Sequence, residues 1–214
     1  MSIAQRIDYA RSRINRGDRA RAVDVLRTGL LHVNPTDDNT ALDAATATAA
    51  ALLAELTLTD GDPAAALPCA AWAYRSLQHL LGARFPETRF ALKVLAAAHR
   101  RAGNLTEAAN HYSDLVRHHT TAEGPRALPT LAAQATLALV LHQGGHCAQA
   151  CQLLARTAAT HRAVYPRHPD GTRMHHELTR MRASCLDQGH GHPQEPTGHR
   201  ATSQPQTADR RPPA

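Results

Sequence analysis

The chain has 214 residues, of which 43% are apolar and only 3% are aromatic. This length suits one domain with one core, and an apolar content carried by Ala, Leu and Val favours closely packed helices over a sheet, which prefers β-branched and aromatic residues. The net charge is +6, and the basic residues are 23 arginines and Lys93. These residues form no run of five, and the aromatic residues are scattered along the chain. We therefore expect no nucleic-acid-binding surface.

The N-terminal residues 1–13 mix charged and apolar side chains and lack the continuous apolar centre of a signal peptide. The most apolar stretch, residues 44–54, is too short to span a bilayer. We therefore expect a cytoplasmic protein that makes no membrane contact. In that compartment the cysteines should be reduced thiols; they are Cys69, Cys147, Cys151 and Cys185.

An internal repeat is the strongest signal in the sequence. Four glycines recur at intervals of 44, 42 and 42 residues, namely Gly17, Gly61, Gly103 and Gly145. An alanine stands seven residues before and five residues after each glycine, and these alanines are Ala10, Ala22, Ala54, Ala66, Ala96, Ala108, Ala138 and Ala150. Threonines that follow a proline by one to three residues recur at intervals of 42, at Thr88, Thr130 and Thr172.

This repeat predicts a series of helical hairpins. A glycine can adopt the left-handed conformation that ends one helix, and Asp18, Asp62 or Asn104 directly after it can cap the next helix. The alanines let the two helices approach closely, so we expect no room for a larger side chain at Ala108 or Ala150. The recurring threonines are expected to act as N-caps of the next hairpin. Because each hairpin leaves one apolar face uncovered, the hairpins must stack.

In chain order, the predicted helices cover residues 3–16 and 19–33, 40–59 and 63–81, 87–102 and 105–121, then 127–143 and 146–164. A ninth helix over 172–187 begins a fifth repeat that is not completed, since Gly189, Gly191 and Pro193 follow. We expect this helix to cap the stack with a polar outer side formed by His175, His176, Glu177 and Arg180. The sequence thus predicts a helical domain over 1–187 and a disordered Pro-, Gly- and His-containing tail over 188–214.

The pattern resembles the tetratricopeptide repeat (TPR) family. Its turn glycine and two small packing positions match the glycines and alanines above, and its large second-helix residue matches Leu26, Tyr112 and Leu154, with Ala70 as a smaller substitute. Residues 98–109 are the best local match. A 42-residue period is similar to the kinesin-light-chain-like variety, although the usual aromatic residue of the first helix is missing. The resemblance covers about residues 3–187 and implies an all-α, right-handed solenoid of about four hairpins plus a C-terminal capping helix.

The resemblance also implies that a polypeptide partner lies along the concave surface, which is lined by the first helix of each repeat. The matching groove positions are Arg11, Asn15, Glu55, Lys93, Arg100, Arg101, His142, Gln143, His176 and Thr179. Their excess of positive charge predicts a partner with acidic side chains or a free carboxylate; the alternative is an ordinary solvated helix face. A chaperone-type carboxylate clamp is not expected, because Ala97 replaces the required Asn four residues after Lys93.

The candidate metal ligands in the sequence are His142, His146, Cys147 and Cys151. The two cysteines are spaced i, i+4 and could share a helical face, as zinc ligands do. However, the repeat places both beside Ala150 in the seam between helices, where a cysteine packs as a small apolar residue. We therefore interpret them as core residues and predict no metal and no cofactor.

Enzyme signatures are absent from the sequence. It contains no Gly-x-Ser-x-Gly, no glycine-rich phosphate loop and no His-Glu-x-x-His. A Cys/His pair that meets only in space leaves Cys151 or Cys185 open as a nucleophile. We predict a non-enzymatic scaffold or adaptor that binds a polypeptide in the groove. Two alternatives are a regulatory module acting on a bacterial transcriptional or signalling regulator, and an accessory protein that presents a peptide in natural-product maturation.

Overall fold

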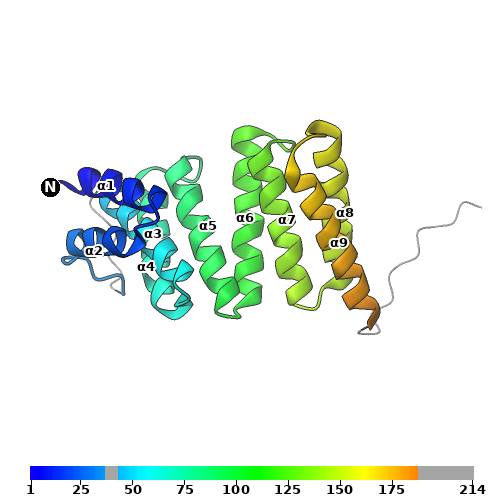
Figure 1. Ribbon diagram of the computed structural model, residues 1–214, viewed down its shortest axis with the longest axis horizontal. Coiled ribbons are helices and arrows are strands. Elements are labelled where there is room, and N and C mark those ends of the chain that lie inside the picture. The colour runs from blue at the N-terminus through cyan, green and yellow to red at the C-terminus, as the bar shows by residue number, and fades with distance from the viewer. Residues whose placement is uncertain (37–42, 188–214) are drawn as a thin grey trace, which may run out of the picture.

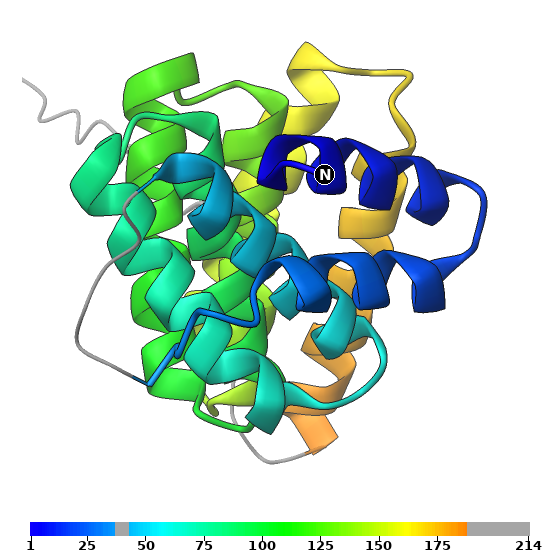
Figure 2. The same cartoon turned by 90° about the vertical axis from the view of Figure 1, so that its left-hand side faces the viewer.

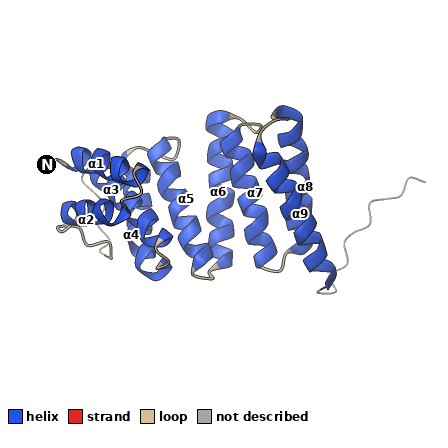
Figure 3. Ribbon diagram, in the orientation of Figure 1, coloured by secondary structure: helices blue, strands red, loops and turns tan. Residues whose placement is uncertain are grey.

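The computed structural model describes residues 1–36 and 43–187, so the predicted tail over 188–214 lies outside the described residues. Within the described residues all regular structure is helical (Figure 3). The helices are α1 (Ile3–Asn15), α2 (Arg19–Gly29), α3 (Ala44–Thr59), α4 (Pro63–Leu80), α5 (Pro86–Arg101), α6 (Leu105–Glu123), α7 (Leu128–Gln143), α8 (Cys147–Val164) and α9 (Pro169–Asp187). Among these helices, none combines the length and hydropathy needed to cross a membrane.

The helices form a single stack in which each packs against the next one in the chain (Figure 1). Helices α1 and α2 lie at one end and α9 lies at the other. The axes of α1 and α2 run across those of the later helices, so the hairpins rotate along the stack (Figure 2). The first helices of successive repeats also contact each other, because α1 packs on α3 and α3 packs on α5. The fold is therefore an all-α solenoid of four hairpins and a capping helix.

The turns between paired helices have the predicted backbone conformation. Gly17, Gly61, Gly103 and Gly145 have φ angles of 79°, 92°, 83° and 81°, in the left-handed region that glycine adopts without strain. Asp18 and Asp62 cap the helices that follow, through hydrogen bonds from the backbone N–H of Arg21 and Ala65. Asn104 does not act as predicted, because its side chain makes no capping hydrogen bond. Instead, Nδ2 of Asn104 lies 3.4 Å from Nδ1 of His99.

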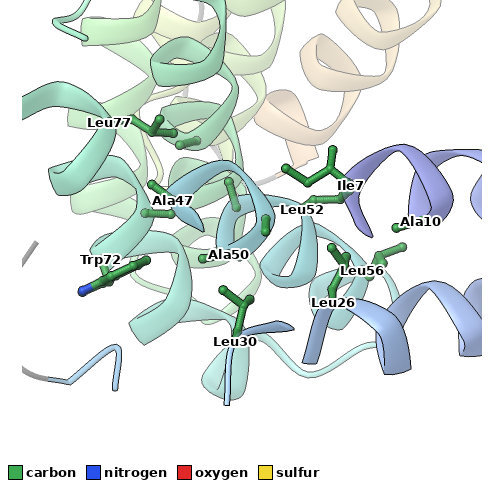
Figure 4. Close-up of a cluster of buried hydrophobic side chains, with 14 of the residues drawn as sticks. Ile7, Ala10, Leu26, Leu30, Ala47, Ala50, Leu52, Leu56, Trp72 and Leu77 are labelled. Carbon is green, nitrogen blue, oxygen red and sulfur yellow. The ribbon is translucent and has the colours of Figure 1, made fainter. Parts of the chain in front are cut away.

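The small packing positions are confirmed, because all eight repeat alanines have an exposed fraction of 0%. Methyl groups at these positions let the paired helices come close, while larger residues such as Leu26 and Leu154 fill the space beside them. Figure 4 shows the N-terminal part of this core, where Ile7 and Ala10 of α1 gather with Leu26 of α2 and with side chains of α3. Burial of such side chains, worth about 25 cal/mol per Å² of apolar surface, joins neighbouring repeats.

Three helix boundaries lie three or four residues from their predicted positions. Helix α2 ends at Gly29, not at residue 33, and packs closely there on α1: a Cβ at Gly29 would lie 2.7 Å from Cδ of Arg6. Helix α3 begins at Ala44 instead of residue 40, because the Asp43 carboxylate accepts a capping hydrogen bond from Thr46. Helix α9 begins at Pro169, three residues before the predicted start.

The recurring threonines are not N-caps. Thr88 and Thr130 are the third residues of α5 and α7, and both are buried. Their hydroxyls donate hydrogen bonds to backbone carbonyls at 3.2 Å and 2.8 Å, which joins each helix start to the preceding segment. In α9 the third residue is Gly171, and Thr172 is exposed. The ring of His161 occupies this space, 3.0 Å from where a Cβ of Gly171 would lie.

Candidate functional site

The predicted groove residues of α3, α5 and α7 lie on one face and contact each other across repeats. Lys93 of α5 pairs with Glu55 of α3, with 3.2 Å between Nζ and Oε1. Arg100 of α5 donates from Nε to Oε1 of Gln143 of α7 at 2.8 Å. The guanidinium of Arg101 donates a hydrogen bond to a backbone carbonyl of α3. These bonds between first helices orient the basic side chains of α5 along the surface.

Two adjoining hollows mark the N-terminal part of this face. One, of about 240 Å³, is lined by Arg11, Asn15 and Glu55 at its polar side and by Ile14, Thr48, Leu52 and Phe90. The other, of about 430 Å³, shares Arg11 and Thr48 with the first and extends to residues such as Asp8, Phe85 and Glu87. Both are open depressions with partly apolar walls, which suits side chains of a bound polypeptide.

The charge of this face is mixed, and its positive groups lie on α5 and at Arg11 of α1. Lys93 lies between Glu55 and the ring of Phe90, whose centroid is 5.0 Å from Nζ. The side chains of Lys93 and Glu55 are 51% and 36% exposed, so their pairing contributes little to stability and can be exchanged for another partner. Asp8 and Glu87 contribute negative charge to the larger hollow. An acidic ligand is therefore favoured near α5 and not along the whole face.

The predicted groove positions on α9 lie outside the hollows and outside the hydrogen bonds that join the first helices. His176 and Thr179 are exposed, and the Thr179 hydroxyl donates to the carbonyl of His175 in its own helix, at 3.1 Å. Neither residue lines the nearby hollow of about 440 Å³ between α7 and α9, whose walls include His142, Glu177, Arg180 and Asp187. The structure thus places two of the ten predicted positions away from the hollows and from the bonded network.

A cluster of thiols and one imidazole lies where α7, α8 and α9 meet. The Sγ atoms of Cys147 and Cys185 are each 3.7 Å from Nδ1 of His142. These three atoms all lie within 4.8 Å of one another. Cys151 is outside this set of three, but its thiol neighbours that of Cys185. His146, which the sequence grouped with the cysteines, is exposed.

Burial affects the protonation of Cys151 and Cys185. It raises the pKa of Cys185 to about 12, with further increases from Cys147 and Cys151, and it also raises the pKa of Cys151. Burial likewise raises the pKa of Cys69 to about 11. A thiol with so high a pKa is protonated at neutral pH and is a weak nucleophile. The environment of Cys151 and Cys185 therefore gives no support to the alternative that either is a catalytic nucleophile.

A second polar cluster contains His161, His168 and Asp170, with ligand atoms within 4.8 Å of one another. Its carboxylate is already engaged, because Asp170 accepts a hydrogen bond from Arg173 and lies 3.6 Å from Nδ1 of His168. The guanidinium of Arg173 opposes a cation at this position by like-charge repulsion. We therefore regard this cluster as part of the α8–α9 packing.

The repeat architecture has counterparts among solved structures. No family model and no curated protein matches the chain. A crystal structure of nearly identical TPR-like repeats from a Podosopora anserina protein described as a kinesin light chain superposes with a TM-score of 0.71 at 21% identity, covering 88% of this chain and 89% of that one. BtubC (BKLC) from P. vanneervenii superposes with a TM-score of 0.57 at 14% identity, covering 98% of this chain and 87% of that one. The chain has the TPR-like solenoid fold, similar to that of kinesin-light-chain repeats.

Proposed function

We propose that the chain is a non-enzymatic scaffold that binds a polypeptide along the face formed by the first helices of its repeats. The observation that carries this proposal is the pair of adjoining hollows, about 430 and 240 Å³, at the N-terminal end of that face. They offer apolar contacts beside polar side chains, as peptide-binding surfaces of helical repeats do. TPR-like repeats are typical of proteins that hold other proteins, which supports the same reading.

The partner is a polypeptide with acidic groups, and it engages α5. Lys93, Arg100 and Arg101 project from this one helix and are aligned by bonds to α3 and α7. Because the Lys93–Glu55 pair is exposed, Lys93 can exchange Glu55 for a carboxylate of the partner at little energetic cost. Neighbouring basic groups on a hollowed surface reinforce each other's field. Arg11, which lines both N-terminal hollows, adds to this field.

The test compares two charge-reversal double variants. Lys93→Glu with Arg100→Glu changes the α5 surface, and Arg27→Glu with Arg156→Glu makes the same charge change at exposed positions on α2 and α8. The partner is first captured from native cytosol with the full chain and identified, and its affinity is then measured with purified proteins. We expect the α5 variant to bind more than about tenfold more weakly, which is about 1.4 kcal/mol, while the control variant binds normally.

Two further measurements decide between the alternatives. Higher salt should weaken binding, because exposed charges are screened beyond about 8 to 10 Å at ordinary ionic strength. Unchanged affinity in the α5 variant, together with loss of binding when residues 188–214 are deleted, would place the site in the tail and reject the groove. The identity of the captured protein separates a regulatory module, which binds a regulator, from an accessory protein, which binds a biosynthetic enzyme or precursor peptide.

A further inference from the structure

The cysteine–histidine cluster draws its members from three successive helices. His142 lies in the last turn of α7, Cys147 is the first residue of α8 and Cys151 follows one turn later. Cys185 comes from the last turn of α9, 34 residues after Cys151. Only the packing of α9 against the last hairpin brings its thiol to the other three side chains.

Ordinary core packing does not account for this arrangement. The exposed fractions of Cys147, Cys151 and Cys185 are 6%, 6% and 0%, which a small apolar residue would also show. Packing alone, however, does not call for an imidazole nitrogen that faces two thiols at the same distance of 3.7 Å. A thiol is also a weak hydrogen-bond donor, so these contacts stabilise the fold only slightly.

The spacing fits tetrahedral coordination by thiolates and imidazole. Zinc binds Cys sulfur at about 2.3 Å and His nitrogen at about 2.0 to 2.1 Å, so neighbouring ligand atoms around one tetrahedral ion are about 3.5 to 3.8 Å apart. The two sulfur-to-Nδ1 distances are 3.7 Å. A Cys₃His set is among the usual ligand sets of structural zinc sites, and soft thiolates select zinc over calcium or magnesium.

We propose that His142, Cys147, Cys151 and Cys185 form a structural zinc site that fastens α9 to the α7–α8 hairpin. Each cysteine that binds loses its thiol proton, and His142 binds through Nδ1. The sequence favoured a packing role for Cys147 and Cys151. Cys185 changes that interpretation, because it joins His142 and Cys147 in a set whose ligand atoms all lie within 4.8 Å of one another, with Cys151 beside it as the fourth ligand of the proposed site. His142 also lines the open hollow between α7 and α9, which gives a hydrated cation a path to the cluster.

The site would stabilise the C-terminal end of the solenoid. Helix α9 begins a repeat for which the described residues contain no second helix, and it buries only one side, with Met174, Leu178 and Met181. A metal that binds the folded chain and not the unfolded one adds its binding free energy to the free energy of unfolding. Because Cys185 lies near the end of α9, a bond there holds the whole helix against the stack.

The experiment titrates the reduced, metal-free full chain with zinc alone and with cobalt as a spectroscopic probe. We expect one zinc ion per chain, a higher melting temperature with zinc, and the thiolate-to-cobalt charge-transfer band and strong visible bands of tetrahedral cobalt. Cys147→Ser and Cys185→Ser should each weaken zinc binding at least about a hundredfold. Mutating a residue that only supports a metal ligand already weakens binding by up to about a hundredfold, so loss of a ligand should cost at least as much. Cys69→Ser and His146→Gln are the matched controls and should bind as the parent chain does.

Further variants distinguish the loss of a zinc ligand from misfolding, and the cluster from other zinc-binding residues. His142→Gln changes a half-buried side chain at the surface of the cluster, so it tests the site even when a buried cysteine variant fails to fold. If His142→Gln and Cys185→Ser both bind zinc as tightly as the parent chain does, the proposal is overturned. So would zinc binding that is lost only when residues 188–214, with His190, His192 and His199, are removed. A disulfide among the three clustered cysteines in a chain that takes up no zinc would also overturn it.

Discussion

A buried imidazole lies at the junction of α8 and α9. His161 is 1% exposed, and within the described part of the chain neither of its ring nitrogens has a hydrogen-bond partner. The groups that face it are the rings of Tyr165 and His168, with centroids 5.5 and 5.3 Å away, and the nearby carboxylate of Asp170. Gly171 makes room for the ring, because a side chain there would collide with it. His161 therefore belongs to the core as a neutral side chain.

Acid should destabilise the fold through this residue. Burial lowers the pKa of His161, His168 lowers it further, and Asp170 raises it in part. The unfolded chain has an ordinary histidine pKa of about 6.5, so below that pH it binds the proton first. The free energy of unfolding is therefore fully maintained above about pH 6.5 and falls as the pH decreases toward the lower pKa of the folded state.

The variant His161→Leu tests this expectation. Denaturant unfolding at a series of pH values from 7.5 to 5 should show a shallower loss of stability in the variant than in the parent. The slope should not vanish, because burial also lowers the pKa of His99, His111, His118 and His119. Parallel curves for the two proteins would show that His161 is not protonated in this range.

At the scale of the helical elements, the turns decide where each helix ends. The α7–α8 turn contains two adjacent glycines with opposite requirements. Gly145 has a φ of 81°, in the left-handed region, whereas Gly144 has a φ of −81° and is open to any residue. A Cβ at Gly144 would make ordinary contacts of 3.5 to 3.6 Å, and one at Gly145 would meet nothing within 4 Å. The difference between the two positions is thus purely conformational.

Alanine substitution at each glycine separates these requirements. Gly145→Ala should lower the free energy of unfolding by about 1 to 2 kcal/mol, the cost of a left-handed conformation for a residue with a side chain. Gly144→Ala should be neutral or stabilise by up to about 1 kcal/mol, because it restricts the unfolded chain. Equal effects in thermal or denaturant unfolding would show that the turn changes its conformation to accept a side chain.

At the scale of the whole molecule, the stack is held together by contacts between neighbours. Helices far apart in the chain, such as α1 and α9, lie at opposite ends (Figure 1). The stability of such a solenoid is close to a sum of terms for repeats and their interfaces. Damage at one end should therefore unfold that end locally, and α9 is the terminal element on which this can be tested.

Two leucines of α9 provide a matched pair. Leu178 is 7% exposed and packs toward the stack, while Leu186 is 63% exposed on the same helix. Leu178→Asp should lower the free energy of local unfolding of α9 by about 2 to 5 kcal/mol for the lost buried side chain, and further for the added charge. Hydrogen exchange should show lost protection in α9 and the facing part of α8 only. Leu186→Asp should leave protection unchanged, and loss of protection as far as α1 in the Leu178 variant would contradict the local model.

The sequence by itself determined the repeat and the outline of the fold. A left-handed turn at Gly103 and a close helix approach at Ala108 are requirements of single positions, so they are visible as residue types at a fixed period. The capping role of Asp18 and Asp62 is local in the same way. Such signals predicted the helical hairpins, although the threonines at the helix starts were misread, because a buried side-chain bond such as that of Thr88 depends on the preceding helix.

Only the tertiary structure decided which side chains meet between repeats. The pairing of Lys93 with Glu55 and the approach of Cys185 to His142 depend on how far each helix slides and rotates against the next. A shift of one residue in α9 puts Gly171 and not Thr172 at the third position of the helix, where it faces the ring of His161. The angle at which packed helices cross depends on all of the core side chains between them, so it cannot be predicted from residue types that recur at a fixed period.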